Sequence, residues 1–115
     1  MYSATFTFIQ GKDDAEFRQR DQAIADIAQG IPGYLGEEAW ENPSTGLRSN
    51  VYYWATLEAL QALMEHPAHT AAKQQQARWL QGYHVVIAQV LHRYGDGGID
   101  HPLSCKTTGA ADVPY

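Results

Sequence analysis

The stretch YHVVIAQVLHRY, residues 83–94, decides the fold, because it has the pattern of a long strand with apolar side chains on both faces. Side chains alternate between the two faces of a strand. The apolar side chains are Val85, Ile87 and Leu91 on one face and Val86, Ala88 and Val90 on the other. A strand of this kind has to be covered on both faces, either by the rest of its chain or by a second chain.

Three further strands are predicted upstream of this stretch. Residues 3–9 (SATFTFI) alternate threonine with apolar residues, which is the period-two pattern of a strand. Residues 34–40 and 48–55 flank a loop of turn-forming residues at 42–46, so they are predicted to form a hairpin. Together with residues 83–94 they make four strands.

Helical patterns lie between these strands. Residues 13–29 begin with aspartates that can cap a helix, end before Gly30, and carry an apolar stripe formed by Phe17, Ile24, Ile27 and Ala28. Thr56 is placed to cap a second helix, whose apolar face is Leu57, Leu60, Leu63 and Met64. A further helical piece is predicted from Pro67 to about Leu80, because proline is favoured at the first position of a helix.

The order of elements is therefore strand, helix, strand, strand, helix, strand. Such a βαββαβ unit folds as a four-stranded antiparallel sheet with its helices on one face, which is a ferredoxin-like α+β domain. The other face of the sheet, with one apolar side of residues 83–94, is then left bare. A second copy of the chain that lays its own sheet against this face would cover it, so we expect a homodimer.

Size and charge exclude several other classes of protein. The chain has 115 residues and a net charge of -5, and its eight Lys and Arg residues are scattered, so nucleic acid is not an expected partner. Its apolar stretches are far shorter than the roughly 18 residues of a membrane span, and MYSATFTF does not have the pattern of a signal peptide. We expect a soluble cytoplasmic protein without membrane contact.

One domain accounts for most of the chain. Residues 1–95 are expected to form it, and residues 96–115 are a turn-rich tail or arm, not a separate domain. The single cysteine, Cys105, lies in this tail and excludes an internal disulfide.

Three stretches resemble the antibiotic biosynthesis monooxygenase superfamily. They are IPGYLGEEAW (residues 31–40), YYWATLEALQALMEHPAH (residues 52–69) and YHVVIAQVLHRYG (residues 83–95). The resemblance implies a dimeric α/β barrel. It also implies one of two activities: oxygenation of aromatic polyketides or quinols without a metal or prosthetic group, or the binding or degradation of haem.

The resemblance also suggests site residues. Asn50 and Trp54 match a pocket Asn and Trp of the polyketide oxygenase branch, whereas Trp40 and Leu60 stand where that branch has His and Tyr. The haem-degrading branch uses an Asn, a Trp and a His, and the aligned positions here are Ala4, Leu63 and Lys73. None of these three matches, so that mechanism does not carry over. No cofactor is expected, and haem held by another histidine is the alternative.

Each candidate residue also has a structural explanation. Asn50 and Tyr52 share a strand face with Trp54 and could line a pocket, but Asn50 could equally face solvent and both aromatic residues could belong to the core. His69 could act as a general base, or it could be a hydrogen-bonded surface or interface histidine. His66 is expected to cap the helix that follows it, and these two histidines alone make no convincing metal site.

These patterns lead to one functional hypothesis and two alternatives. The hypothesis is a cofactor-independent monooxygenase that acts with molecular oxygen on a hydrophobic aromatic or quinol-type molecule. Asn50, Trp54 and His69 would be catalytic, and Trp40 and Tyr52 would bind the substrate. The alternatives are a non-catalytic dimer that binds haem or another apolar ligand, and a dimer without any ligand.

Overall fold

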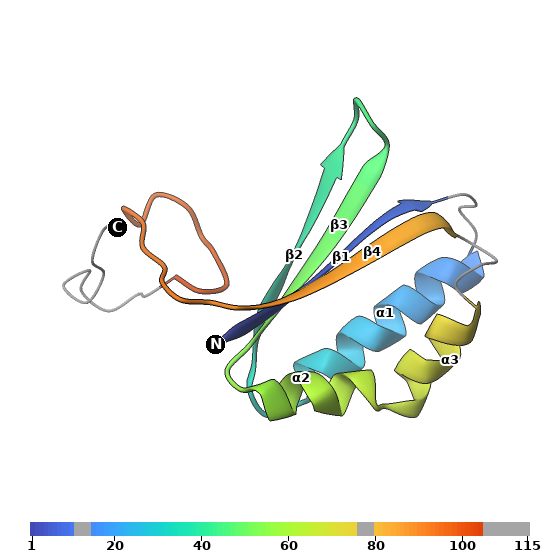
Figure 1. The fold of residues 1–115 in the computed structure, drawn as a ribbon, viewed down its shortest axis with the longest axis horizontal. Coiled ribbons are helices and arrows are strands. Elements are labelled where there is room, and N and C mark those ends of the chain that lie inside the picture. Colours follow the sequence, from blue (N-terminus) through green and yellow to red (C-terminus); the bar gives the residue numbers. More distant parts are fainter. Residues whose placement is uncertain (11–14, 76–79, 105–115) are drawn as a thin grey trace.

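The computed structural model describes residues 1–10, 15–75 and 80–104. Its elements follow the predicted order, with the second helical region divided in two (Figure 1). They are β1 (Tyr2–Gln10), α1 (Ala15–Gln29), β2 (Tyr34–Asn42), β3 (Leu47–Trp54), α2 (Leu57–Met64), α3 (Pro67–Gln75) and β4 (Leu80–Gln89). No helix within the described ranges has the length and apolar character needed to cross a membrane.

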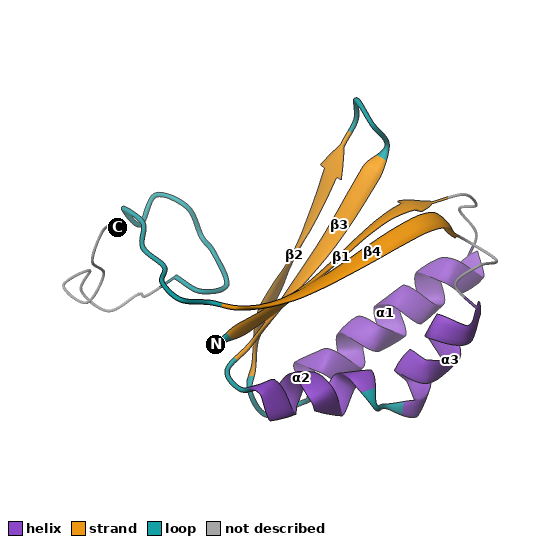
Figure 2. Cartoon of the chain, viewed as in Figure 1, coloured by secondary structure: helices purple, strands orange, loops and turns teal. Residues whose placement is uncertain are grey.

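The four strands form one antiparallel sheet in the order β2-β3-β1-β4, so β2 and β4 are its edges. The three helices of the described residues lie on one face of this sheet, and none of them lies on the other face (Figure 2). The chain is therefore a ferredoxin-like α+β domain, as the sequence predicts.

The packed core lies where α2 and the end of α1 meet the end of β3. Trp54 is 0% exposed and Leu60 is 2% exposed, and Ala28, Ala59 and Leu63 complete the buried cluster. Gly33 allows the helix layer to come this close. Its φ of +100° favours glycine, and a Cβ atom at Gly33 would lie 2.8 Å from the Cβ of Ala59.

Both predicted caps of the helices after β3 are present. The Thr56 hydroxyl accepts a hydrogen bond from the Ala59 N–H at 3.2 Å, at the start of α2. The His66 Nδ1 accepts one from the Ala68 N–H at 3.1 Å, at the start of α3. The predicted end of this last helix at about Leu80 falls partly on residues 76–79, outside the described residues.

The prediction for the last strand is wrong at both ends, because the length of β1 sets the length of β4. Leu80 pairs with Gln10 at one end of the ladder, and Gln89 pairs with Tyr2 at the other. Gly82 therefore lies inside the strand and does not precede it. Beyond Gln89 the Val90 N–H donates one more hydrogen bond, to the carbonyl of Met1 just before β1, and the chain then has no strand partner as far as residue 104.

The helix-free face of the sheet is mixed in character. Cross-strand partners share a face, so Val86 and Ala88 lie there, together with Tyr53 and Trp40. Hydroxyl side chains lie among them, namely Ser3, Thr5 and Thr7 of β1 and Ser49 of β3, with 3.2 Å between the hydroxyl oxygens of Thr7 and Ser49. Val86 is 48% exposed in the single chain.

Part of the predicted tail folds back onto this helix-free face. The His101 Nε2 lies 3.0 Å from a carboxylate oxygen of Glu38, and the Tyr53 hydroxyl donates to the other oxygen at 3.0 Å. Pro102 packs on Gly36, where a Cβ atom would come within 2.5 Å of the Pro102 Cβ. Cys105 lies outside the described residues.

Candidate functional site

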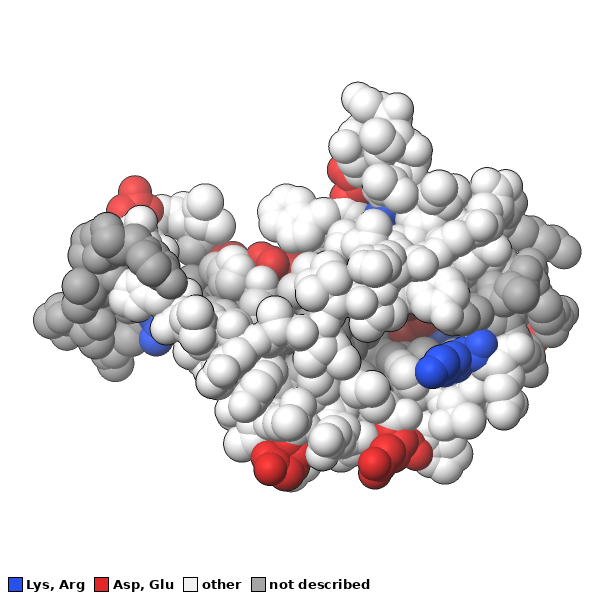
Figure 3. Space-filling model, viewed as in Figure 1, with Lys and Arg blue, Asp and Glu red and all other residues white. Residues whose placement is uncertain are grey.

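A cavity of about 400 Å³ lies between the helix layer and the sheet, beside the packed core. Figure 3 shows the hollow from outside, with basic side chains at its edge. The sheet supplies Ala4, Phe6, Asn50, Tyr52, Tyr83, Val85 and Ile87 to its wall, and the helices supply Asp21, Ile24, Leu60, Leu63, Met64, His69 and Lys73. Most of these side chains are apolar, so the cavity suits a hydrophobic ligand.

The space remains because the helices do not close over the β4 edge of the sheet. The helices make their contacts with the sheet mainly through β1, β2 and β3. On β4, the side chains that face the helix layer stay partly exposed, with Val85 at 48% and Ile87 at 44%. Val85 and Ile87 thus form an open wall of the cavity.

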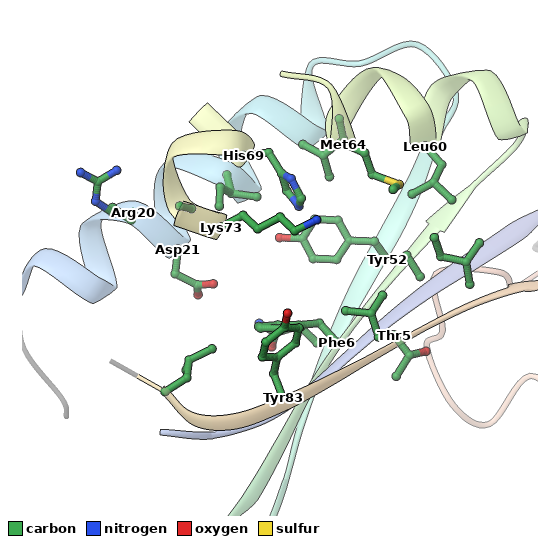
Figure 4. Close-up of a pocket in the computed structure, with 18 of the residues that line it drawn as sticks. Thr5, Phe6, Arg20, Asp21, Tyr52, Leu60, Met64, His69, Lys73 and Tyr83 are labelled. Atoms are coloured by element: carbon green, nitrogen blue, oxygen red, sulfur yellow. The ribbon is translucent and has the colours of Figure 1, made fainter. Parts of the chain in front are cut away.

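Four of the polar groups come from three different elements. Asp21 is on α1, Tyr52 is on β3, and His69 and Lys73 are one turn apart on α3. In Figure 4, Asp21, His69 and Lys73 point into the cavity from the helices, and Tyr52 points into it from the sheet. Tyr83 and Phe6 lie on the sheet wall, across the cavity from the helices. The cavity therefore combines an apolar lining with a group of acid–base side chains at one end.

The imidazole of His69 is held in its neutral form. Burial lowers the pKa of His69 below its ordinary value of 6.5, the charge of Lys73 lowers it further, and a hydrogen bond with the backbone of Met64 opposes the change in part. A neutral imidazole in a cavity can accept a proton from a bound ligand.

The acidic groups around Tyr52 keep its phenol protonated. Burial raises the pKa of Tyr52, and the nearby Glu37 and Asp21 carboxylates raise it further. Burial also raises the pKa of Tyr34 to about 12, helped by the 2.9 Å hydrogen bond that its hydroxyl donates to Glu37. The Asp21 pKa is raised by burial of its carboxyl end and by Glu37, while Arg48 acts in the opposite direction.

Several solved structures have this arrangement of strands and helices. A variant of SnoaB from Streptomyces nogalater, a cofactor-independent oxygenase, superposes with a TM-score of 0.68 and 11% identity, over 80% of this chain and 94% of that one. Candidate antibiotic biosynthesis monooxygenases give TM-scores of 0.64 for the Nitrosomonas europaea protein and 0.62 for the Deinococcus radiodurans protein. Their identities are 17% and 19%, and they cover 80% and 83% of this chain and 100% and 97% of their own. This chain has the antibiotic biosynthesis monooxygenase fold.

The resemblance noted in the sequence is thus confirmed at the level of the fold. By sequence, YqjZ of Bacillus subtilis (strain 168), an uncharacterized protein, is 27% identical over 90 residues, which are 77% of this chain and 78% of YqjZ. No family model matches the chain. Within the antibiotic biosynthesis monooxygenase fold, the roles of individual residues have to be argued from this chain's own geometry.

The structure brings three of the five predicted site residues together. Asn50, Tyr52 and His69 line the cavity. Trp54 does not line it, because it is fully buried in the adjacent core, with its ring centroid 6.3 Å from that of Tyr52. The indole Nε1 of Trp54 has no hydrogen-bond partner among the described residues.

Trp40, which was predicted to bind the substrate, does not line the cavity, and a β-bulge explains why. Tyr34 pairs with Trp54 and faces the helices, but the register shifts before Gly36, which pairs with Tyr53. This shift exchanges the two faces for the remainder of β2. Trp40 therefore pairs with Ser49 on the helix-free face and is 63% exposed.

Two residues of the cavity, Asp21 and Lys73, were not assigned to the site from the sequence. Asp21 interrupts the apolar stripe of the first helix four residues after Phe17, which was a usable signal. Lys73 follows His69 by four residues, so both lie on one face of α3. Within the described ranges, no group of three His, Cys, Asp or Glu side chains is placed to hold a metal ion.

Proposed function

We propose that this protein is a cofactor-independent monooxygenase that acts on a hydrophobic aromatic or quinol-type small molecule. The observation that carries the proposal is a largely apolar cavity of about 400 Å³ in which a neutral imidazole, His69, faces the ligand space. This volume lies in the range of small-molecule sites, about 300–1,000 Å³. SnoaB, a protein of the same fold, is a cofactor-independent oxygenase, which supports this chemistry.

The cavity residues have distinct roles in the proposed reaction. His69 accepts the proton of a substrate hydroxyl, which leaves an electron-rich anion that can pass an electron to molecular oxygen. The amide of Asn50 and the protonated hydroxyl of Tyr52 donate hydrogen bonds to substrate oxygens and hold the ring in place. Trp54 acts through its packing beside Tyr52, since it does not reach the cavity.

The test is oxygen uptake and product formation with a panel of anthrones and hydroquinones. We expect products that form only in the presence of oxygen. His69→Ala should lower the rate by about 10²–10⁴-fold, because it removes the general base. His92→Ala is the matched control, since His92 is exposed and lies beyond β4.

Two results would contradict this proposal. Identical product profiles with and without oxygen would exclude an oxygenase. A Soret band that appears on titration with haemin and is lost in His69→Ala would favour the non-catalytic haem-binding alternative.

We also propose that the protein is a homodimer in which the two helix-free sheet faces pack together and complete an α/β barrel. The exposed Val86 and Trp40 on that face support this arrangement, because the area would otherwise meet water. Sedimentation equilibrium at micromolar concentration should give twice the mass of the chain. Val86→Glu should shift the equilibrium toward single subunits, and a wild-type protein that sediments as a stable single chain would exclude the barrel.

A further inference from the structure

We infer that Lys73 is the cation that stabilises the substrate anion formed when His69 removes a proton, so the ligand is an aromatic O–H acid. The inference deepens the proposed function and rests on it for the aromatic nature of the ligand. Trp54 lies in the core and does not line the cavity, and the donors proposed above, Asn50 and Tyr52, carry no positive charge. The negative charge of a substrate anion therefore has to be met by another group.

The position of Lys73 is the first support. Lys73 and His69 both line the cavity and lie four residues apart on α3, where side chains at this spacing are neighbours. Figure 4 shows the Lys73 side chain extending from α3 into the cavity on the same side as His69. The positive charge of Lys73 lowers the pKa of His69, as expected for neighbouring groups.

The charges around the cavity are the second support. Its other ionisable side chains are Arg20 and Asp21 on α1, Tyr52 on β3 and Tyr83 on β4. Arg20 contacts Glu16 at 3.8 Å, and burial, with the nearby Glu37 and Asp21 carboxylates, raises the pKa of Tyr52. Within the described part of the chain, no side chain forms an ion pair with Lys73.

Ligand binding changes the environment of this ammonium group. In the empty cavity Lys73 is exposed and can be solvated by water. An aromatic ligand that fills the cavity removes much of that water, and an ammonium group without water or a counter-charge is costly. A ligand that carries its own negative charge removes this cost, so ionised ligands should be preferred over neutral ones of the same shape.

The proton transfer is balanced without any other reactant. The substrate O–H bond breaks, its proton goes to a ring nitrogen of His69, and the electron pair stays on the substrate oxygen. The resulting phenolate lies between the imidazolium and the Lys73 ammonium. Lys73 by itself opposes a positive charge on His69, and the phenolate offsets this repulsion.

The test is a spectrophotometric titration of bound 4-nitrophenol, whose ionised form absorbs visible light. With the wild-type protein, the pKa of the bound phenol should fall by about one unit or more, as expected for an opposite charge within about 4–6 Å. Lys73→Met should return it close to the value in water, and Lys73→Arg should keep most of the shift. Gln74→Met is the matched control, since Gln74 is exposed on the same helix and does not line the cavity.

A comparison of ligands gives a second readout without a variant. Wild-type protein should bind 4-nitrophenolate more tightly than neutral nitrobenzene, and Lys73→Met should remove the preference. An unchanged phenol pKa in Lys73→Met, or equal affinities for the two ligands, would overturn the inference. Because neither measurement requires oxygen, their failure is distinguishable from absent oxygen uptake, which would contradict the proposed function instead.

Discussion

The space between the sheet and the helices is filled at one end and hollow at the other. At the filled end, Trp54 and Leu60 are almost completely buried against Ala28. At the hollow end, Val85 and Ile87 of β4 face the same helix layer and remain nearly half exposed. Similar apolar residues thus have different roles according to how closely the helices approach, and the acid–base side chains lie in the hollow part. The filled end should therefore contribute most to stability, and the hollow end holds the proposed site.

Shortening an apolar side chain should give the largest difference in stability between the two ends. Leu60→Ala should lower the free energy of unfolding by about 2–5 kcal/mol, since it empties a packed position. Ile87→Ala should cost about 1 kcal/mol or less, because the Ile87 side chain is already 44% exposed. Urea unfolding measures both, and equal losses would contradict the distinction between the ends.

Replacing a glycine by alanine should give a smaller difference in stability between the two ends. Gly33→Ala at the filled end combines a φ of +100° with a close approach to Ala59, and should cost about 1–3 kcal/mol of stability. Gly82→Ala on β4 meets no atom within 4 Å and should change stability by no more than about 0.5 kcal/mol. If thermal unfolding showed both variants equally destabilised, the close packing inferred at Gly33 would be wrong.

The smallest effect should be the change in stability with pH that comes from His69, in the hollow end. The pKa of His69 is lower in the folded chain than its ordinary value of 6.5, so between the two values the unfolded chain binds more protons. Stability from this group is therefore present above pH 6.5 and is lost as the pH falls through the folded pKa. His69→Gln should remove this loss.

NMR titration of the His69 ring protons measures its pKa directly. A titration at or above the ordinary value would show that the imidazole is not held neutral. A wild-type protein and a His69→Gln variant with parallel stability curves between pH 7.5 and 5 would lead to the same conclusion.

The sequence was sufficient for the topology because local patterns determine it. Strand alternation, the turn at residues 42–46 and the caps at Thr56 and His66 all depend on residues close in the chain. The ends of β4 could not be predicted, since they depend on where β1 begins and ends. Trp40 was assigned to the site from the resemblance alone, and the register shift between Tyr34 and Gly36, which turns Trp40 to the other face, leaves no clear sequence signal.

The site was predictable in part for the same reason. Asn50 and Tyr52 lie on one face by strand alternation, and that face proved to be the cavity face. Asp21 and Lys73 join them only when α1 and α3 are placed over the sheet, and this placement depends on contacts between distant parts of the chain. The hollow itself results from the position of β4 at the sheet edge, which no local pattern specifies.

A two-dimensional ¹H–¹⁵N NMR titration with a hydroquinone would show where the ligand binds. We expect shift changes at His69, Val85 and Ile87 in the hollow end, with Gly33 and Ala59 in the filled end unaffected. Changes confined to the helix-free face of the sheet, or no changes at millimolar ligand, would contradict this expectation.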